Sequence, residues 1–164
     1  MGKLVRAQGE TYKEMLPLFR ELVLESGLRK GDRVLWSGCP GTCYAMATFY
    51  SFGIRDLGFG IFFSVDSSLD EIWRLEYRDH VGVMATRKES PGKAELIILM
   101  SGLLRVPFEK TKKLVQEALA DSGRVMGETV VPGLFERAGW TKEISFDSFF
   151  EFSMVNPAAF VAKR

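Results

Sequence analysis

Short apolar runs, spaced along the chain and separated by helix-like segments, limit the fold more than any other feature of this sequence. The runs lie at residues 33–37, 57–65, 81–85, 95–100 and 124–131. Runs that are apolar at nearly every position are typical of strands covered on both faces, which occur mainly in parallel sheets. We therefore expect one α/β domain over residues 1–164, a three-layer Rossmann-like fold with helices on both faces of a mostly parallel sheet.

Helical periodicity and capping residues predict the segments between these runs. Thr11 and Glu14 form a capping-box pattern, and FEKTKKLVQEALADSG gives the clearest amphipathic spacing. Ser67 or Ser68 is expected to cap a helix that ends near Tyr77. The predicted helices lie at residues 11–26, 43–52, 68–77, 108–123 and 134–139.

The last apolar stretch, FDSFFEFSMV at residues 146–155, alternates phenylalanine with polar residues over part of its length. This alternation predicts an edge strand at the C-terminal end of the sheet. Two interpretations of its dense aromatic side chains stay open. In the first, the aromatic side chains close the core of a single chain. In the second, the strand forms a homodimer contact by edge pairing or aromatic packing.

Charge and hydropathy exclude several classes of partner. The chain carries 22 Lys and Arg against 21 Asp and Glu, so it has no strong field to attract nucleic acid. Its apolar runs are far shorter than the roughly 20 residues of a membrane-spanning helix. The N-terminal residues lack the apolar core of a signal peptide, which predicts a cytoplasmic protein. One asparagine and two glutamines are few, a composition that indicates a thermophilic source.

Three short loops follow predicted strands at the edge where parallel sheets bind ligands. They span residues 37–42, 64–68 and 101–105, and each is rich in glycine, serine or aspartate. Glycines and helix starts offer backbone N–H groups to a phosphate or carboxylate, and Arg105 is the expected cation. The best hypothesis is therefore a site for an anionic small molecule, such as a nucleotide or a phosphorylated cofactor. The predicted ligand-binding residues are Ser37, Gly38, Cys39, Gly41, Thr42, Asp66, Ser67, Ser101, Gly102 and Arg105.

The motif SGCPGTC at residues 37–43 also supports simpler interpretations. It lacks the glycine spacing of dinucleotide folds and the P-loop lysine, so no cofactor is identified. Pro40 removes one N–H donor from an anion cradle, and the glycines could serve only a compact turn. The turn and the anion site are equally good interpretations.

Cys39 and Cys43 provide a second hypothesis, a thiol enzyme or redox protein. A cysteine beside a helix start has a lowered pKa, and Cys43 could then act as the resolving thiol for Cys39. The alternative is that Cys43 is a small buried apolar residue and Cys39 belongs to the turn. Two thiols are too few for a closed zinc or iron–sulfur site in one chain, so no metal is expected.

Three further polar residues have less specific interpretations. His80 is expected at the amino end of a strand, away from the predicted ligand edge. Asp66 ends a strand at that edge, although an Asx turn or a helix cap is the better explanation of it. Glu128 interrupts an apolar run and either is buried with Arg105 or faces solvent.

The stretch VMGETVVPGLFERAGWTKEISFDSFFEFSMV at residues 125–155 resembles a small archaeal family found chiefly in methanogens. FERAGW followed by SFD carries most of this resemblance, and SGLLRVP and the glycine–proline–cysteine turn agree with it. The resemblance implies a Rossmann-like α/β domain in the cytoplasm of an archaeon. It implies no activity, because none is assigned to that family.

Overall fold

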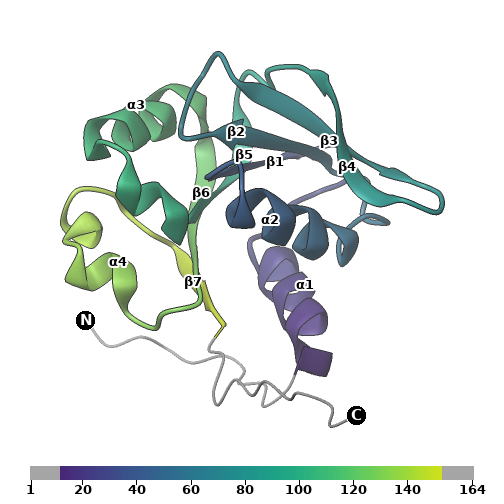
Figure 1. The fold of residues 1–164 in the computed structure, drawn as a ribbon, viewed down its shortest axis with the longest axis horizontal. Coiled ribbons are helices and arrows are strands. Elements are labelled where there is room, and N and C mark those ends of the chain that lie inside the picture. Colours follow the sequence, from purple (N-terminus) through teal and green to yellow (C-terminus); the bar gives the residue numbers. More distant parts are fainter. Residues whose placement is uncertain (1–11, 153–164) are drawn as a thin grey trace, which may run out of the picture.

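The computed structural model describes residues 12–152, which form one seven-stranded mixed sheet with helices on both faces (Figure 1). The strand order is β4-β3-β2-β1-β5-β6-β7. The strands are β1 (Arg33–Gly38), β2 (Gly60–Val65), β3 (Ile72–Arg78), β4 (Gly82–Lys88), β5 (Ala94–Met100), β6 (Leu119–Thr129) and β7 (Ser148–Glu151). The predicted three-layer α/β architecture and its mostly parallel sheet are confirmed.

Five of the strands run parallel and form the larger part of the sheet. β1 pairs in parallel with β2 and β5, and β6 pairs in parallel with β5 and β7. The central strands are apolar because both of their faces are covered: all five residues from Val34 to Gly38 and all five from Leu96 to Met100 are buried. Their registers align the carboxyl ends of β1, β2 and β5, since Ser37 pairs with both Ser64 and Leu99.

The remaining two strands form an antiparallel hairpin at one edge of the sheet. β3 pairs antiparallel with β2 and with β4. The helix predicted at residues 68–77 is therefore wrong, and β3 takes its place. The reason lies in the alternation of Trp73, Leu75 and Tyr77 with three charged residues, which suits a strand of period two. Ser67 and Ser68 accordingly belong to a turn and cap no helix.

Two layers of helices cover the sheet. Helices α1 (Met15–Glu25) and α2 (Thr42–Phe52) bury Phe19, Ala47 and Tyr50 on one face. Helices α3 (Phe108–Ala118) and α4 (Leu134–Arg137) bury Leu114 and Phe135 on the other. Three short 3-10 helices complete the fold: η1 (Tyr12–Glu14), η2 (Ser101–Arg105) and η3 (Trp140–Lys142).

Several element boundaries differ from the prediction. The helix at 108–123 ends at Ala118, because residues 119–123 already belong to the long strand β6. The strand predicted from residue 57 begins at Gly60, after a turn at Gly58 whose φ is positive. The first helix begins at Met15 behind η1, and its predicted cap Thr11 lies outside the described residues.

The C-terminal strand β7 is the edge strand that the sequence predicts. Phe150 packs into the α1 and α2 layer, and Phe146 and Phe149 pack against the α4 layer. The aromatic side chains therefore contribute to the core of a single chain. The predicted homodimer contact stays a prediction, and residues 153–155 of it lie outside the described part of the chain.

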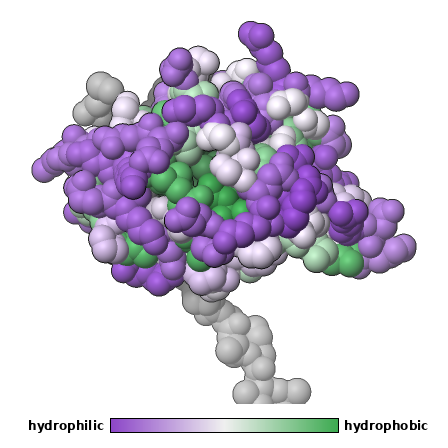
Figure 2. Space-filling view, turned by 90° about the horizontal axis from the view of Figure 1, so that it is seen from above, coloured by the Kyte–Doolittle hydropathy of each residue, from purple (hydrophilic) through white to green (hydrophobic). Residues whose placement is uncertain are grey.

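The outer surface has the polar character of a globular domain. Figure 2 looks onto the face that carries α3 and the β3–β4 hairpin, where hydrophilic side chains surround a smaller group of apolar ones. Salt bridges join charged side chains across the hairpin, among them Arg87 with Glu76 and Lys88 with Glu71. Among the residues that the structure describes, every helix is too short or too polar to cross a bilayer.

Candidate functional site

The order of the parallel strands locates the candidate site. Counted along the chain, these five strands have the order 2-1-3-4-5, the doubly wound arrangement in which the connections diverge between the first and third strands. Here those two strands are β1 and β5. The loop after β1 carries Cys39, and the segment after β5 is η2, which carries Gly102 and Arg105. The topology therefore brings two of the three predicted loops together at the usual ligand edge.

Glycines allow these segments to pack closely around the two sulfur atoms. A Cβ atom at Gly102 would lie 2.3 Å from Sγ of Cys43 and 3.1 Å from Sγ of Cys39. A Cβ atom at Gly38 would lie 2.5 Å from Cβ of Cys43. The distances of 2.3 Å at Gly102 and 2.5 Å at Gly38 are shorter than any real contact of a Cβ atom, so glycine is required at both positions. The backbone of η2 thus lies directly against the start of α2.

The sulfur of Cys39 occupies the position where an anion was predicted. It accepts hydrogen bonds from the backbone N–H groups of Gly41 and Cys43, the second at 3.4 Å. The Thr42 hydroxyl lies 3.7 Å away, and the Cys43 thiol also hydrogen-bonds to it. We call these four groups the donor ring of Cys39. The amides that the sequence assigned to a ligand therefore serve a sulfur atom of the protein itself.

The two cysteines differ in acidity because their surroundings differ. Burial alone would raise the pKa of Cys39, but the hydrogen bonds of the donor ring outweigh it and lower the pKa to about 7. For Cys43, burial and the hydrogen bond to Cys39 together raise the pKa to about 12. Near neutral pH Cys39 is therefore partly a thiolate, and Cys43 is a thiol. The Cys39 side chain is half-buried, so solvent reaches it.

The third loop contributes an ion pair beside this cysteine. Asp66 donates its backbone N–H to the carbonyl of Gly38 at 2.9 Å, and its carboxylate accepts a hydrogen bond from Nη2 of Arg105. The Arg105 side chain is 52% exposed and that of Asp66 is 25% exposed. Asp66 and Arg105 thus connect the ends of β2 and β5 across the loop that holds Cys39. The fold thus brings the loops that carry Cys39, Asp66 and Arg105 to one edge of the sheet.

Two serines of the predicted site, Ser37 and Ser67, have their hydroxyls inside the protein. Ser67 Oγ lies 3.1 Å from Ser37 Oγ and 2.9 Å from Thr111 Oγ1, and all three residues are buried. Asp66 and Ser67 have φ values of +51° and +57°, which few residues other than glycine adopt. The hydroxyl chain therefore holds a strained turn against α3, and with it the backbone of Asp66.

The other predicted ligand residues lie at the surface of the same region. Gly41 precedes the first turn of α2 and is exposed, as is Thr42. Ser101 begins η2 and is half-buried. Gly41 and Thr42 lie beside Cys39, and Ser101 begins the helix that ends at Arg105; their role in binding a ligand stays a prediction.

Glu128 is a buried acid whose environment the sequence left undecided. It is 3% exposed at the end of β6, and Tyr50 of α2 donates a hydrogen bond to it at 3.4 Å. Burial raises its pKa to about 7, and the Tyr50 hydrogen bond opposes this only in part. Glu128 is therefore buried, as one of the two interpretations had it, but Tyr50 is its partner, because Arg105 pairs with Asp66; the solvent-facing alternative is wrong. The only feature of the sequence that pointed to this buried carboxyl was a single Glu within an apolar run.

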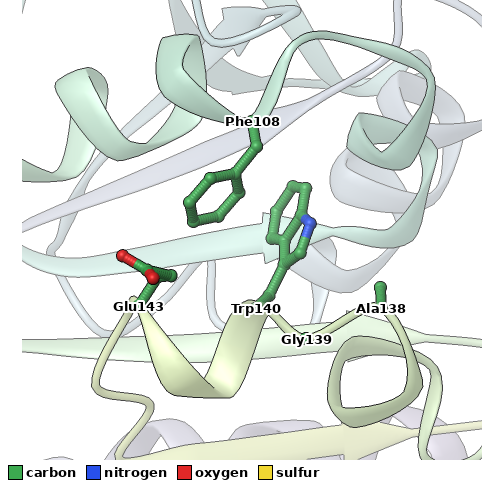
Figure 3. Close-up of a pocket in the computed structure, with 5 residues that line it drawn as sticks. All are labelled: Phe108, Ala138, Gly139, Trp140 and Glu143. Carbon is green, nitrogen blue, oxygen red and sulfur yellow. The ribbon is translucent and has the colours of Figure 1, made fainter.

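A hollow of about 260 Å³ lies between the start of α3 and η3, lined by residues that the sequence did not suggest (Figure 3). The rings of Phe108 and Trp140 lie 5.1 Å apart, with Glu143 beside them. Trp140 also contacts Phe135, and Glu143 pairs with Lys112 at 3.0 Å. These contacts pack η3 and α3 onto the sheet, and the residues that line the hollow include no cysteine, serine, threonine or histidine.

Comparisons with known proteins identify relatives over most of the chain. A family described as an uncharacterized protein conserved in archaea, DUF2124, matches residues 10–155. An uncharacterized protein of Methanothermobacter thermautotrophicus is 31% identical over 151 residues, 90% of this chain and 91% of the relative. One from Methanocaldococcus jannaschii is 31% identical over 137 residues, 81% of this chain and 80% of the relative.

A solved structure is similar over nearly the whole fold. It is the crystal structure of a protein of unknown function from Methanothermobacter thermautotrophicus, with a TM-score of 0.82 and 28% identity. The match covers 98% of this chain and 99% of that chain. The resemblance to an archaeal family with members in methanogens is confirmed by these relatives.

Proposed function

The chain belongs to the archaeal family DUF2124, and from the geometry at the start of α2 we propose that it is a thiol-dependent enzyme with Cys39 as its nucleophile. The donor ring of Cys39 carries this proposal, because four donors directed at one sulfur stabilise its negative charge. A cysteine that served only the turn would need no such set of donors. The switch-point position adds support, since ligands of doubly wound sheets bind there.

The proposed step is covalent attack on an electrophilic carbon of a small substrate. The Cys39 proton passes to solvent, and the sulfur electron pair then forms a bond to that carbon. The bond from the carbon to its leaving group breaks, and its electron pair departs on the leaving group. Attack of water on the adduct releases the second product and returns the thiol. Cys43 keeps its proton throughout and donates it as a hydrogen bond to the thiolate.

Alkylation by iodoacetamide across a range of pH tests the proposal. We expect the Cys39 rate to rise with pH around a midpoint near 7, the pKa that the donor ring sets. A cysteine in an unstructured peptide has its midpoint at about 8.5. Peptide mapping assigns the label to Cys39, and Cys39→Ser provides the control by losing the fast phase. A profile that matches the peptide would refute the nucleophile.

The variant Cys43→Ala tests the donor ring itself. Removing the thiol removes one hydrogen bond to the Cys39 thiolate, so we expect the midpoint of the alkylation profile to move to higher pH. Thr42→Val removes a second donor and should move it in the same direction. An unchanged midpoint in both variants would mean that the ring does not control the acidity of Cys39.

The contact between the two sulfurs also favours a second candidate, a dithiol redox protein. In this case the Cys39 thiolate attacks a small disulfide and releases one thiol. Cys43 then loses its proton and attacks Sγ of Cys39, which releases the second thiol and forms an intrachain disulfide. The high pKa of Cys43 makes this second step slow at neutral pH, and for that reason we rank it below covalent catalysis. A mass loss of two hydrogens after treatment with oxidised glutathione would support it.

A further inference from the structure

We propose that Arg105 recognises a negatively charged group on the substrate of Cys39, so that this substrate is an electrophile bearing a carboxylate or phosphate. The inference rests on the proposed function and names its substrate class. It starts from the position of Arg105 on η2 and from the way Asp66 contacts it.

The geometry of η2 directs Arg105 to the same side as Cys39. In a 3-10 helix, residues three apart project from the same face, and each residue advances the helix by about 2 Å. Gly102 and Arg105 are three apart in η2, and the side of Gly102 where a Cβ would stand faces both sulfur atoms. Arg105 therefore leaves η2 on that face, about 6 Å further along the axis.

Asp66 fixes the other end of this arrangement. Its N–H binds the carbonyl of Gly38, the residue before Cys39, so the carboxylate that meets Arg105 is tied to the same loop. The ion pair and the nucleophile are thus held by neighbouring segments at the same edge of the sheet.

Arg105 has donors left for a ligand. Its contact with Asp66 uses Nη2 and one carboxylate oxygen, whereas a guanidinium offers five N–H donors. The side chain is half exposed, and no second carboxylate pairs with it among the ion pairs of the described residues. A carboxylate or phosphate can therefore bind a free edge of the guanidinium, or replace Asp66 there. Asp66 then acts as a resident competitor that keeps the arginine in place between ligands.

Two alkylating agents of nearly equal size but different charge test this inference. Iodoacetate carries a carboxylate, and iodoacetamide is neutral. Both rates are measured on the full chain at about pH 9, where the Cys39 thiol and the thiol of a reference cysteine peptide are both mostly ionised. We expect the ratio of the iodoacetate rate to the iodoacetamide rate at Cys39 to exceed that of a cysteine peptide by about two- to fivefold, the size of one exposed ion pair. Added salt should reduce the excess.

Matched variants assign the effect to one side chain. Arg105→Gln should return the ratio to the peptide value, whereas Arg87→Gln should leave it unchanged, since Arg87 is a similarly exposed, ion-paired arginine on β4. Asp66→Asn should raise the ratio, because it removes the competitor. Asparagine tolerates the positive φ of this position as aspartate does, so the turn is retained.

The outcomes separate this inference from the proposed function. A peptide-like ratio in the wild-type chain, or a ratio that Arg105→Gln leaves unchanged, would overturn the role of Arg105 even if Cys39 has its shifted pH profile. A peptide-like pH profile with iodoacetamide would instead refute Cys39 as an activated nucleophile, whatever the ratio is. If Arg105→Gln lowered the iodoacetate and iodoacetamide rates by the same factor, the substitution would act on the reactivity of the Cys39 thiol and not on the charge of the reagent. That result would also overturn the inference.

Discussion

Glu128 places a carboxyl group in the apolar layer beneath α2, where Tyr50 is its hydrogen-bond partner. Because burial raises its pKa to about 7, the folded protein holds a proton that an unfolded chain releases near the ordinary value of 4.5. The stability that this proton gives is fully present below about pH 4.5 and is lost as the pH rises to about 7. One pKa unit corresponds to about 1.4 kcal/mol, so the loss is of the order of 3 kcal/mol.

Glu128→Gln tests this prediction by removing the titration while keeping a side chain of similar shape. We expect the free energy of unfolding in urea to fall between pH 5 and pH 7.5 in the wild type by more than in the variant. Taking the difference between the two proteins cancels the other titrating groups, including carboxyls such as Glu95 whose pKa Arg33 lowers. An equal pH dependence in both proteins would show that Glu128 is ionised in the fold.

At the scale of single residues, the sequence identified most residues of the candidate site but not the contacts between them. Cys39, Asp66, Gly102 and Arg105 were all predicted, since loops after strands and the properties of each side chain are visible in sequence. Their pairings were not visible. Arg105 meets Asp66 from 39 positions away, and Glu128 meets Tyr50 from 78 positions away.

At the scale of elements, the contact between η2 and α2 decides whether the site can form. Gly102→Ala places a Cβ where the Cys43 sulfur lies, so either η2 moves outward or the sulfur does. We expect a loss of stability of about 1–3 kcal/mol, typical of added atoms in a packed region, together with slower alkylation of Cys39. Thermal unfolding and the iodoacetamide rate measure the two effects.

Ser101→Ala is the matched control for this element, because it changes the neighbouring residue of η2 without adding an atom. It should leave both the unfolding temperature and the alkylation rate close to those of the wild type. Wild-type behaviour of Gly102→Ala would show that η2 does not press on the two sulfurs. The prediction would then fail, and the positioning of Arg105 through η2 would lose its support.

The hairpin shows where element prediction failed and why. Trp73 to Arg78 alternate apolar and charged residues, yet the Ser and Asp residues before them resemble a helix cap. The same residues instead make a turn in which Asp66 and Ser67 both have positive φ, closed by a hydrogen bond from Ser68 N–H to the Val65 carbonyl. Helix caps and tight turns use the same residue types, so only the pairing of β3 with β2 decides between them.

At the scale of the whole molecule, the sheet has two edges, β4 and β7. The predicted homodimer would use residues 146–155, and with Phe149 and Phe150 packed in the core it depends on backbone pairing along β7. If this pairing forms, sedimentation velocity at rising concentration will show a species of twice the 18.5 kDa chain mass. A single species of one chain mass at the highest concentration would contradict the dimer.

The sequence by itself determined the central buried strands β1, β2 and β5, because a run that is apolar at nearly every position loses water contact favourably wherever it packs. The apolar run at residues 81–85 instead begins the half-exposed edge strand β4. The sequence also determined that glycine-rich loops follow β1 and β5. Only the tertiary structure decided the strand order, the antiparallel hairpin, the burial of Glu128 and the donor ring of Cys39. Each of these depends on a backbone path or on groups that the packed sheet and helices bring together. The N–H groups at the start of α2, which the sequence offered to a ligand, donate to the sulfur of Cys39 in the fold.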